Sequence, residues 1–478
     1  MKNLVRLLCL LLLVAIMVPV FASCEKEPPA TDNTQTNDNT ETSNAIAGIA
    51  QNNYNSDFTI LNPTGGLFDN YYWAEDLSES SNISQANYNR EVAIEGHLGI
   101  EIYHEKYDLG HGALYTKLEQ QILGGLDDYQ VVLTHCFQDL ASLMTAEYIY
   151  DIQNLPGVSF NDEYWNNKIM DSLQYRGGKY LGSSDFILHR PTFMLFNKTM
   201  ADAYEEVGVD TLYQHVRDKT WTIDQMFTYA QLVDISLNDT LSNPMDGTYG
   251  FVSDVNWEMC SFPTASRYFH VSITEDGEYE LKAFNEGIFD IFKKLVSITD
   301  SNYFYGWNWD QADKILHMDT GRVFFSTASV EEMIQQMLGS EVSIGVLPYP
   351  TINAGMEWNN LDWAGYFVVP SIVKNPQLTG EVLELFSYYG ETEIKHEFYD
   401  VLLGLRASKE PQDTEMLDLI FDNLAAEPAL ALLNRGDSNL AQIFYVAPYM
   451  IWSNEKAMGS WYAKYYGAAK LELEELNQ

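Results

Sequence analysis

Residues 192 to 198 read Thr-Phe-Met-Leu-Phe-Asn-Lys, a short apolar run that ends in two polar residues. Its apolar residues are consecutive, which is typical of a strand buried on both faces. Further along, residues 219 to 224 read Lys-Thr-Trp-Thr-Ile-Asp, and Thr222 is expected to cap a helix that begins at Ile223. Strands and helices also alternate before this stretch, so the sequence predicts an α/β fold with a mostly parallel sheet in its first lobe.

Taken with residues 174 to 180 (Gln-Tyr-Arg-Gly-Gly-Lys-Tyr), these motifs resemble the extracellular solute-binding proteins of ABC importers, the lipoprotein branch related to maltodextrin-binding protein. In that family a Gly-Lys-x-Tyr strand, a Phe-Asn-Lys strand end and a Lys-x-Trp-Thr-x-Asp helix start mark the crossing from the first lobe to the second. The resemblance extends from about Asp57 to the C-terminus. It implies a two-lobed, periplasmic-binding-protein-like (type II) fold with a hinge and an interlobe cleft.

A chain of 478 residues is too long for one ordinary core, so two lobes of roughly 150 to 250 residues each are expected. The family layout divides the chain accordingly. We expect a signal peptide at 1–23, a disordered tether at 24–53, lobe 1 at 54–190 and 347–396, and lobe 2 at 191–346 and 397–478.

The N-terminus has the features of an export signal. Lys2 and Arg6 precede the apolar run from Leu7 to Val20, which is shorter than a membrane-spanning helix. Cys24 follows Ala-Ser as in a bacterial lipobox, although Phe21 stands where lipoboxes usually carry Leu. We therefore expect acylation of Cys24 and anchoring at the outer face of the cytoplasmic membrane, with simple secretion as the alternative.

The chain is strongly acidic, with a formal net charge of −41 at pH 7. Loss of Lys2 and Arg6 with the signal peptide takes the charge from −41 to −43. Such a surface repels phosphates, which excludes nucleic acid as a partner. The acidic surface does not by itself identify a cationic ligand.

No motif in the sequence indicates a cofactor or a metal. Cys136 and Cys260 are the two cysteines outside the signal peptide and lipobox, and burial as small apolar residues is favoured over a disulfide. Residues 234 to 239 lack the alternating carboxylates and the central glycine of a calcium loop. No His or Cys spacing indicates another metal site.

Aromatic residues make up 13% of the chain, which is high for a globular protein. Sugar rings present C–H faces that aromatic rings cover, while their hydroxyls need carboxylate and amide partners. A core position is the ordinary place for a single tryptophan. Three clusters nevertheless combine tryptophan with polar residues in predicted loops: Trp73 with Glu75, Asn256 with Trp257, and Trp307 with Trp309 and Asp310.

The resemblance implies further ligand-binding candidates at the ends of predicted strands and on late helices. These are His135, Gln138 and Asp139 after the third strand, Asp185 and Arg190 before the crossover strand, Ser326 and Thr327 at the end of the return strand, Trp363 at the re-entry to lobe 1, and Tyr445 and Trp452 near the C-terminus. A histidine at a strand end is more often structural, so His135 alone is weak support.

The sequence therefore favours a binding protein that captures a carbohydrate, most simply an oligosaccharide, and delivers it as a monomer to an ABC permease. Two alternatives remain. The same fold could bind a peptide, a polyamine or another small solute. A surface-anchored glycoside hydrolase is the alternative from another class, although no Gly-x-Ser-x-Gly, His-Glu-x-x-His or phosphate-binding loop is present and the 68 acidic residues make any carboxylate pair uninformative.

Overall fold

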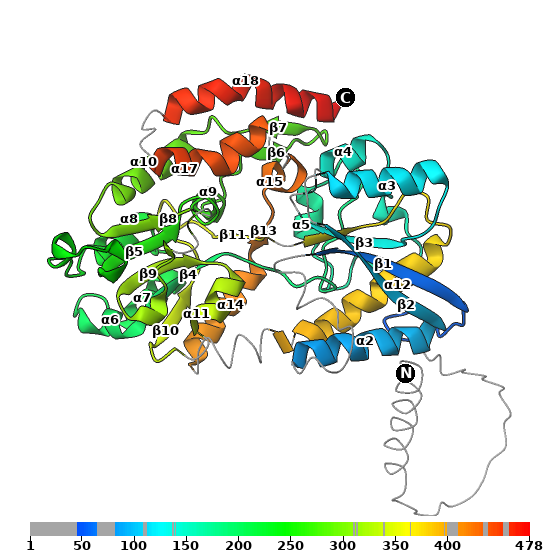
Figure 1. Cartoon of the computed structure of the whole chain (residues 1–478), viewed down its shortest axis with the longest axis horizontal. Coiled ribbons are helices and arrows are strands. Elements are labelled where there is room, and N and C mark those ends of the chain that lie inside the picture. Colours follow the sequence, from blue (N-terminus) through cyan, green and yellow to red (C-terminus); the bar gives the residue numbers. More distant parts are fainter. Residues whose placement is uncertain are drawn as a thin grey trace, which may run out of the picture. The chain divides into compact units, whose positions relative to one another are not determined.

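The computed structural model describes residues 45–64, 82–108, 112–135, 138, 140–308, 311, 314–337, 340–363, 365–395, 397–398, 410–433, 438–452 and 458–478 (Figure 1). The predicted signal peptide, Cys24 and most of the predicted tether lie outside these residues. So do six other residues discussed above: Trp73, Glu75, Cys136, Asp139, Trp309 and Asp310.

The first sheet has the strand order β12-β3-β1-β2. Its strands are β1 (Ser56–Thr64), β2 (Ile100–Asp108), β3 (Val131–His135) and β12 (Gly365–Val368). β1 pairs in parallel with β2 and β3, whereas β12 pairs antiparallel with β3. Because β12 comes from much later in the chain, the polypeptide leaves this sheet and returns to complete it.

Three long helices pack around this sheet: α2 (Asn82–Leu98), α3 (Ala113–Gly124) and α12 (Pro376–Tyr389). Helices α2 and α3 both contact β2, and α2 also packs against α12 (Figure 1). The apolar residues of the four strands are almost all buried, with Phe58, Leu61, Val131 and Val132 fully shielded. The sheet therefore forms one side of a hydrophobic core.

The second sheet has the order β10-β4-β9-β5-β8. Its strands are β4 (Phe193–Asn197), β5 (Tyr249–Asp254), β8 (Phe304–Trp307), β9 (Val323–Ala328) and β10 (Ile344–Leu347). β5 pairs in parallel with β8 and β9, while β4 is antiparallel to β9 and β10. Every residue of β4 is buried, which confirms the prediction from its continuous apolar run.

The aromatic segment from 303 to 310 was expected to be a loop, and that expectation is wrong for its first half. Phe304 to Trp307 form β8, an edge strand in register with Phe251 to Asp254 of β5. Trp307 is buried against the core and does not project from a loop. Aromatic residues fit both a pleated edge strand and a sugar-binding loop, so composition does not separate the two.

The Asn197-Lys198 pair at the end of β4 begins one helix and anchors another. Asn197 caps α6 (Lys198–Ala203) by accepting a hydrogen bond from the N–H of Met200 at 3.0 Å. The buried ammonium of Lys198 lies 2.5 Å from Oδ2 of Asp413 on α14 (Pro411–Asp422). A late helix of the chain is thus fixed to the second sheet by a buried ion pair.

The Lys-Thr-Trp-Thr-x-Asp motif is explained in the same local way. Thr222 accepts a hydrogen bond from the N–H of Gln225 at 3.2 Å and caps α8 (Ile223–Ala230), as predicted. The indole of Trp221 is fully buried and donates to the carbonyl of Pro348 at 2.9 Å. The motif therefore begins a helix and places a tryptophan in the core of the second half of the molecule.

Shorter elements surround the two sheets. The remaining helices before α12 are α4 (Leu140–Thr145), α5 (Asn167–Ser172), α7 (Val209–Arg217), α9 (Ser261–Ala265), α10 (Glu286–Thr299) and α11 (Val330–Met337). Single turns occur at η3 (Ile152–Asn154), η4 (Asn238–Thr240), η5 (Pro244–Asp246), η7 (Met318–Thr320) and η8 (Gly390–Ile394).

Asn44 to Gln478 form one compact unit, in which the described segments around residues 190, 361 and 424 lie side by side and form the hinge. The N–H of Thr192 donates to Leu361 O at 3.0 Å, and the N–H of Trp363 donates to Arg190 O at 3.1 Å. Alongside them β11 (Asn360–Leu361) pairs in parallel with β13 (Leu424–Ala425). The segment around residue 190 is thus hydrogen-bonded to the segment around residue 361, which in turn is hydrogen-bonded to the segment around residue 424.

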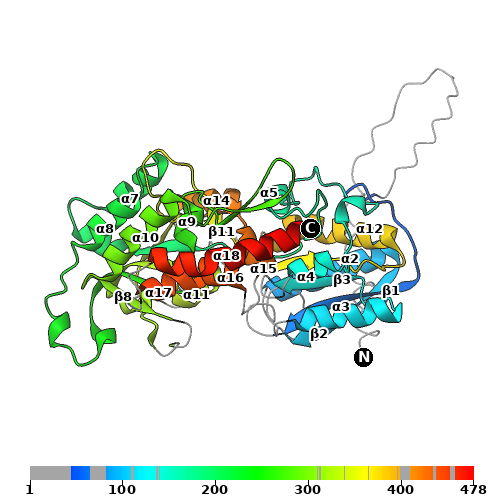
Figure 2. The ribbon, with the colours of Figure 1, turned by 90° about the horizontal axis from the view of Figure 1, so that it is seen from above.

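The C-terminal segment contacts both halves. It comprises α15 (Pro428–Leu433), α16 (Asn439–Ala441), η10 (Gln442–Val446), α17 (Ala447–Trp452) and α18 (Met458–Asn477). Helix α15 packs against α4, and α18 packs against α16 and α17 (Figure 2). Helix α18 also packs against the hairpin of β6 (Val271–Ile273) and β7 (Tyr279–Leu281) (Figure 1). In the described part of the chain no helix is both long and apolar enough to cross a membrane.

Candidate functional site

His135, Arg190 and Trp363 meet where the first sheet joins the hinge. His135 ends β3 and pairs in register with Gly365 of β12, directly after the Trp363 segment. Burial and the neighbouring Arg190 charge lower the pKa of His135 to about 3, against a backbone hydrogen bond with Trp363. The imidazole is therefore neutral at pH 7, and one of its nitrogens is used in the hydrogen bond with the Trp363 backbone.

The second half of the molecule adds Trp257 to this group. Trp257 lies in the loop after β5, and its ring packs against the ring of Trp363 with centroids 5.4 Å apart and an interplanar angle of 80°. Both rings are only partly buried. Four sequence-predicted residues from four distant segments are thus brought together: His135, Arg190, Trp257 and Trp363.

The loop that carries Trp257 is held by Asp254, the last residue of β5. Oδ1 of Asp254 accepts hydrogen bonds from the N–H groups of Asn256 at 2.7 Å and Trp257 at 2.6 Å. Burial raises the pKa of Asp254 to about 6, although these backbone N–H groups and that of Glu258 lower it. Asp254 was not predicted from the sequence.

Buried amide groups with unused hydrogen-bonding atoms occur beside the two tryptophan-bearing segments. Asn256 and Asn308 follow the neighbouring parallel strands β5 and β8, and Oδ1 of each is buried without a partner among the described residues. Gln138, just beyond β3, accepts from the N–H of Leu114 at 3.4 Å, while its Nε2 has no partner in that same set. Such atoms are usually satisfied by water or by a polar ligand.

The hydroxyls of Ser326 and Thr327 are used within the sheet. Ser326 donates to the carbonyl of Thr327 at 2.8 Å, and Thr327 donates to the hydroxyl of Ser253 at 2.8 Å. Both side chains are buried at the end of β9. The Thr327 hydroxyl thus links β9 to β5 beside Asp254, so the contribution of these hydroxyls to the site is the position of the strand ends.

Asp185 is placed on the first half of the molecule, next to α12 and η8. It is buried, and its Oδ2 lies 3.4 Å from Nζ of Lys395. Burial raises its pKa, while Lys395 and His189 lower it. The structure therefore gives Asp185 a local ionic partner and does not place it with the tryptophan pair.

His189 and Asp362 connect two of the crossing segments inside the hinge. Nδ1 of His189 lies 2.7 Å from Oδ2 of Asp362, and Oδ1 of Asp362 accepts from the N–H of Arg190 at 2.8 Å. Burial lowers the pKa of His189, but the charge and hydrogen bond of Asp362, with Asp185 adding, raise it above its ordinary value. Because His189 precedes Arg190 and Asp362 precedes Trp363 in the chain, this buried pair fixes the backbone at both residues.

Two other predicted residues lie elsewhere. Trp307, the last residue of β8, packs in the core. Trp452 lines a narrow internal gap with Val255, Met259 and residues of α10, behind the Trp257 loop. The side chain of Tyr445 is not among those described.

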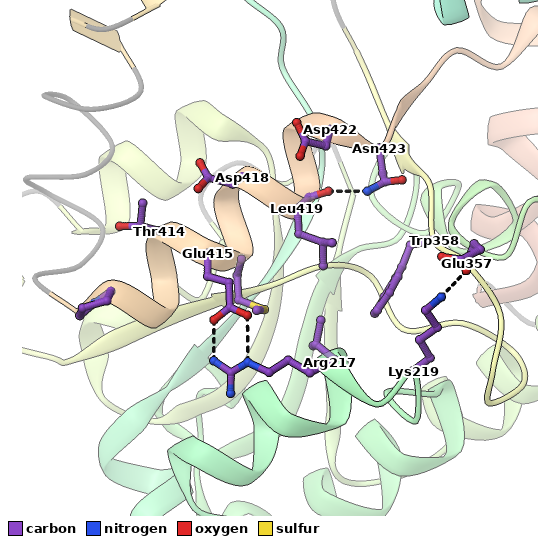
Figure 3. Close-up of a pocket in the computed structure, with 13 residues that line it drawn as sticks. Arg217, Lys219, Glu357, Trp358, Thr414, Glu415, Asp418, Leu419, Asp422 and Asn423 are labelled. Atoms are coloured by element: carbon purple, nitrogen blue, oxygen red, sulfur yellow. Dashed lines mark hydrogen bonds and ion pairs between the residues drawn. The ribbon is translucent and has the colours of Figure 1, made fainter.

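A pocket of about 600 Å³ lies on the second half of the molecule, between α14, the end of α7 and residues 357–358 (Figure 3). None of the predicted ligand-binding residues lines it. Its two cations are already paired: Arg217 with Glu415, at 2.9 Å and 2.5 Å, and Lys219 with Glu357. Both cations that line this pocket therefore already have carboxylate partners.

Comparison with known proteins gives a structural match only. No family model and no curated protein sequence matches the chain. A solved ABC transporter solute-binding protein from Thermotoga lettingae TMO, bound with alpha-D-tagatose, is similar over 88% of this chain and 100% of that chain. Its TM-score is 0.52 and its sequence identity is 12%.

The chain has a periplasmic-binding-protein-like α/β fold. In open α/β sheets, ligands bind beyond the carboxyl ends of the strands. His135, Trp257 and Trp363 occupy such places. In the described residues no group of three or more His, Cys, Asp or Glu side chains has the geometry of a metal site.

Sequence reasoning missed Asp254, His189, Asn308 and Asp362. Asp254 had a usable signal, because an Asp at a strand end followed by Val-Asn is typical of a turn in which the carboxylate accepts from the next backbone N–H groups. Asp362 and His189 had none, since they lie 173 positions apart in the chain.

Proposed function

We propose that this protein is the solute-binding component of an ABC importer and that it captures a carbohydrate, most simply an oligosaccharide, by closure of its two lobes. The observation that carries the proposal is the meeting of His135, Arg190, Trp257 and Trp363 at the hinge. A ligand that contacts such a group touches both lobes at once. It therefore stabilises the closed state over the open one.

The chemistry of this group supports a sugar. Two partly exposed indoles that pack at 80° to each other present apolar surface, which can cover a C–H face of a sugar ring. The neutral imidazole of His135 and the buried amides of Asn256 and Gln138 supply donors and acceptors for hydroxyls. The structurally similar binding protein was solved with a sugar.

A cationic solute is the second candidate for the same fold, and one observation weighs against it. The Arg190 charge lowers the pKa of His135, which indicates positive potential at this point. A polyamine bound there would meet like charge. Acidic surface elsewhere on the chain does not remove that local repulsion.

Catalysis is disfavoured by the bonding of the nearby carboxylates. A glycoside hydrolase needs two carboxyl groups that face the glycosidic bond, one as acid and one as base or nucleophile. Here Asp254 accepts from backbone N–H groups of its own loop, and Asp362 is bound by His189 and Arg190. Incubation with labelled oligosaccharides tests this alternative, and release of shorter products would establish it.

We also propose that the protein is anchored through an acyl chain on Cys24 at the outer face of the cytoplasmic membrane and delivers its ligand to the permease as a monomer. The support is the lipobox-like sequence and the polar segment that follows it. Labelling cells with a radioactive fatty acid is expected to mark the native chain. Cys24→Ala is expected to abolish the label and release the protein from membranes.

Lobe closure is tested by small-angle X-ray scattering with and without ligand. We expect the radius of gyration to fall when a bound sugar, confirmed by calorimetry, is present. An unchanged radius with confirmed binding would contradict the closure mechanism while leaving the binding role intact.

A further inference from the structure

One carboxylate binds the first turn of the loop between Asp254 and Cys260. Asp254 ends β5, and its Oδ1 alone accepts from the N–H groups of Asn256 and Trp257, at 2.7 Å and 2.6 Å. The Trp257 ring then packs edge-on to Trp363 of the hinge. The carboxylate thus binds the backbone of the same tryptophan whose ring contacts the hinge.

The surroundings of Asp254 do not neutralise its charge. No Lys, Arg or His side chain in the described part of the chain forms an ion pair with it. Trp307 of β8 is in register with Asp254, and Ser326 of β9 is in register with Val252; neither side chain titrates. The ionisable groups on this side are the buried Cys260 thiol, whose pKa is raised by burial and by Asp254, and next to that thiol Glu258 and Glu427.

We propose that Asp254 is a positioning residue of the binding site: its ionised carboxylate fixes the loop that holds the Trp257 ring against Trp363. A charged acceptor makes N–H bonds roughly twice as strong as those of a neutral one. Protonation therefore loosens the loop and separates the rings. The consequence for ligand affinity rests on the proposed function, whereas the ring contact itself does not.

The proposal makes the ring contact depend on pH. Burial raises the pKa of Asp254 to about 6, so the carboxylate changes charge between mildly acidic and neutral conditions. Because its pKa in the folded state is above the ordinary value, the ionised group destabilises the fold at neutral pH. A residue kept for stability alone is not expected to have this property, which is common at functional sites.

The test uses the whole chain labelled with 5-fluorotryptophan and observed by fluorine NMR. Its 10 tryptophans give separate probes, and Trp257→Phe and Trp363→Phe identify the resonances of the pair. The spectra are followed from about pH 4.5 to about pH 8, with Trp461 on α18 as an internal control. Asp254→Asn keeps the size of the side chain and imitates its protonated form.

We expect the Trp257 resonance to move with a midpoint at about pH 6 in the native chain while Trp461 stays still. Asp254→Asn is expected to hold the low-pH position throughout and to melt about 2 to 4 °C higher at neutral pH, because a buried charge is removed. This gain in stability with loss of the ring contact separates a positioning role from a structural one.

Three results would overturn the proposal: a Trp257 resonance that does not titrate in this range, an Asp254→Asn variant that titrates like the native chain, or one that holds the high-pH position. The native titration alone is decisive if the variant does not fold. Calorimetry with D-tagatose and maltotriose at both ends of the range separates the two proposals. Failure of every sugar to bind, with Trp257 titrating as expected, contradicts the proposed function only.

Discussion

The ring of Trp257 packs edge-on to the ring of Trp363, with centroids 5.4 Å apart, although the two residues belong to different parts of the molecule. Trp257 follows a strand of the second sheet, and Trp363 lies in the hinge segment that leads back to the first. Any motion of the hinge changes this contact. The pair therefore connects the position of the lobes to the surface that we propose meets the ligand.

Truncation of either tryptophan is expected to weaken ligand binding. Trp257→Ala or Trp363→Ala removes an aromatic face and leaves the other without its partner, so Kd should rise about 10-fold to 100-fold. Isothermal titration calorimetry with the sugar that binds most tightly measures the change. Glu415→Gln, in the separate pocket of Figure 3, is the matched control and is expected to leave Kd unchanged. Equal affinities for the native chain and both tryptophan variants would exclude this pair from the site.

Replacement of Asp413 is expected to destabilise the second half of the molecule strongly. Its buried carboxylate contacts the ammonium of Lys198 and accepts from the hydroxyl of Tyr213 and the N–H of Val346. Asp413→Ala leaves a buried charge without its main partner, which costs about 3 to 5 kcal/mol of unfolding free energy. Urea denaturation measures this loss.

The control for that experiment lies on the same helix. Glu415 is about half exposed and pairs with Arg217 at the surface. Removal of such a pair changes stability by about 0 to 1 kcal/mol. If Asp413→Ala and Glu415→Gln destabilised the chain equally, the buried anchor would not have the importance that its contacts indicate.

The His189–Asp362 pair is expected to make the hinge more stable at lower pH. The pKa of His189 is raised in the folded state, so its stabilisation is fully present below the ordinary histidine pKa and is lost as the pH rises through the folded-state value. The difference in melting temperature between the native chain and His189→Gln should therefore shrink from about pH 6 to about pH 9.

His215 provides a control of opposite sign for this pH experiment. Burial lowers the pKa of His215, so its protonation destabilises the fold and the neutral form is the stable one. The difference between the native chain and His215→Gln should not shrink with rising pH. A constant difference for His189→Gln would show that its buried contact with Asp362 does not depend on charge.

Local patterns in the sequence predicted local structure well. The buried strand β4, the Thr222 cap and the helix that follows it were predicted because each depends on neighbouring residues. The aromatic segment that became β8 was misassigned, since Phe, Tyr and Trp suit a strand and a binding loop equally. Its partner strand β5 lies about fifty positions earlier in the chain, and the periodicity of a short segment gives no information about so distant a partner.

The site was predictable in part: Trp257 from its cluster with Asn256 in a predicted loop, and the other three residues through the resemblance to a family. His135, Arg190, Trp257 and Trp363 were named separately, each from its own strand end or crossing. Nothing in the sequence shows that these four meet, because that depends on four distant segments lying together. Asp362 is one of 68 acidic residues in the sequence. Its carboxylate joins two of the hinge segments, and only its contacts in the structure show this role.

The most direct test of carbohydrate binding at the hinge is a thermal-shift screen of mono- and oligosaccharides, with amino acids, peptides and polyamines on the same plate. The native chain is compared with the double variant Trp257→Ala, Trp363→Ala. We expect a carbohydrate to raise the melting temperature of the native chain and to have little effect on the double variant. Stabilisation only by amines or peptides, or equal stabilisation of both proteins by a sugar, would contradict the central claim.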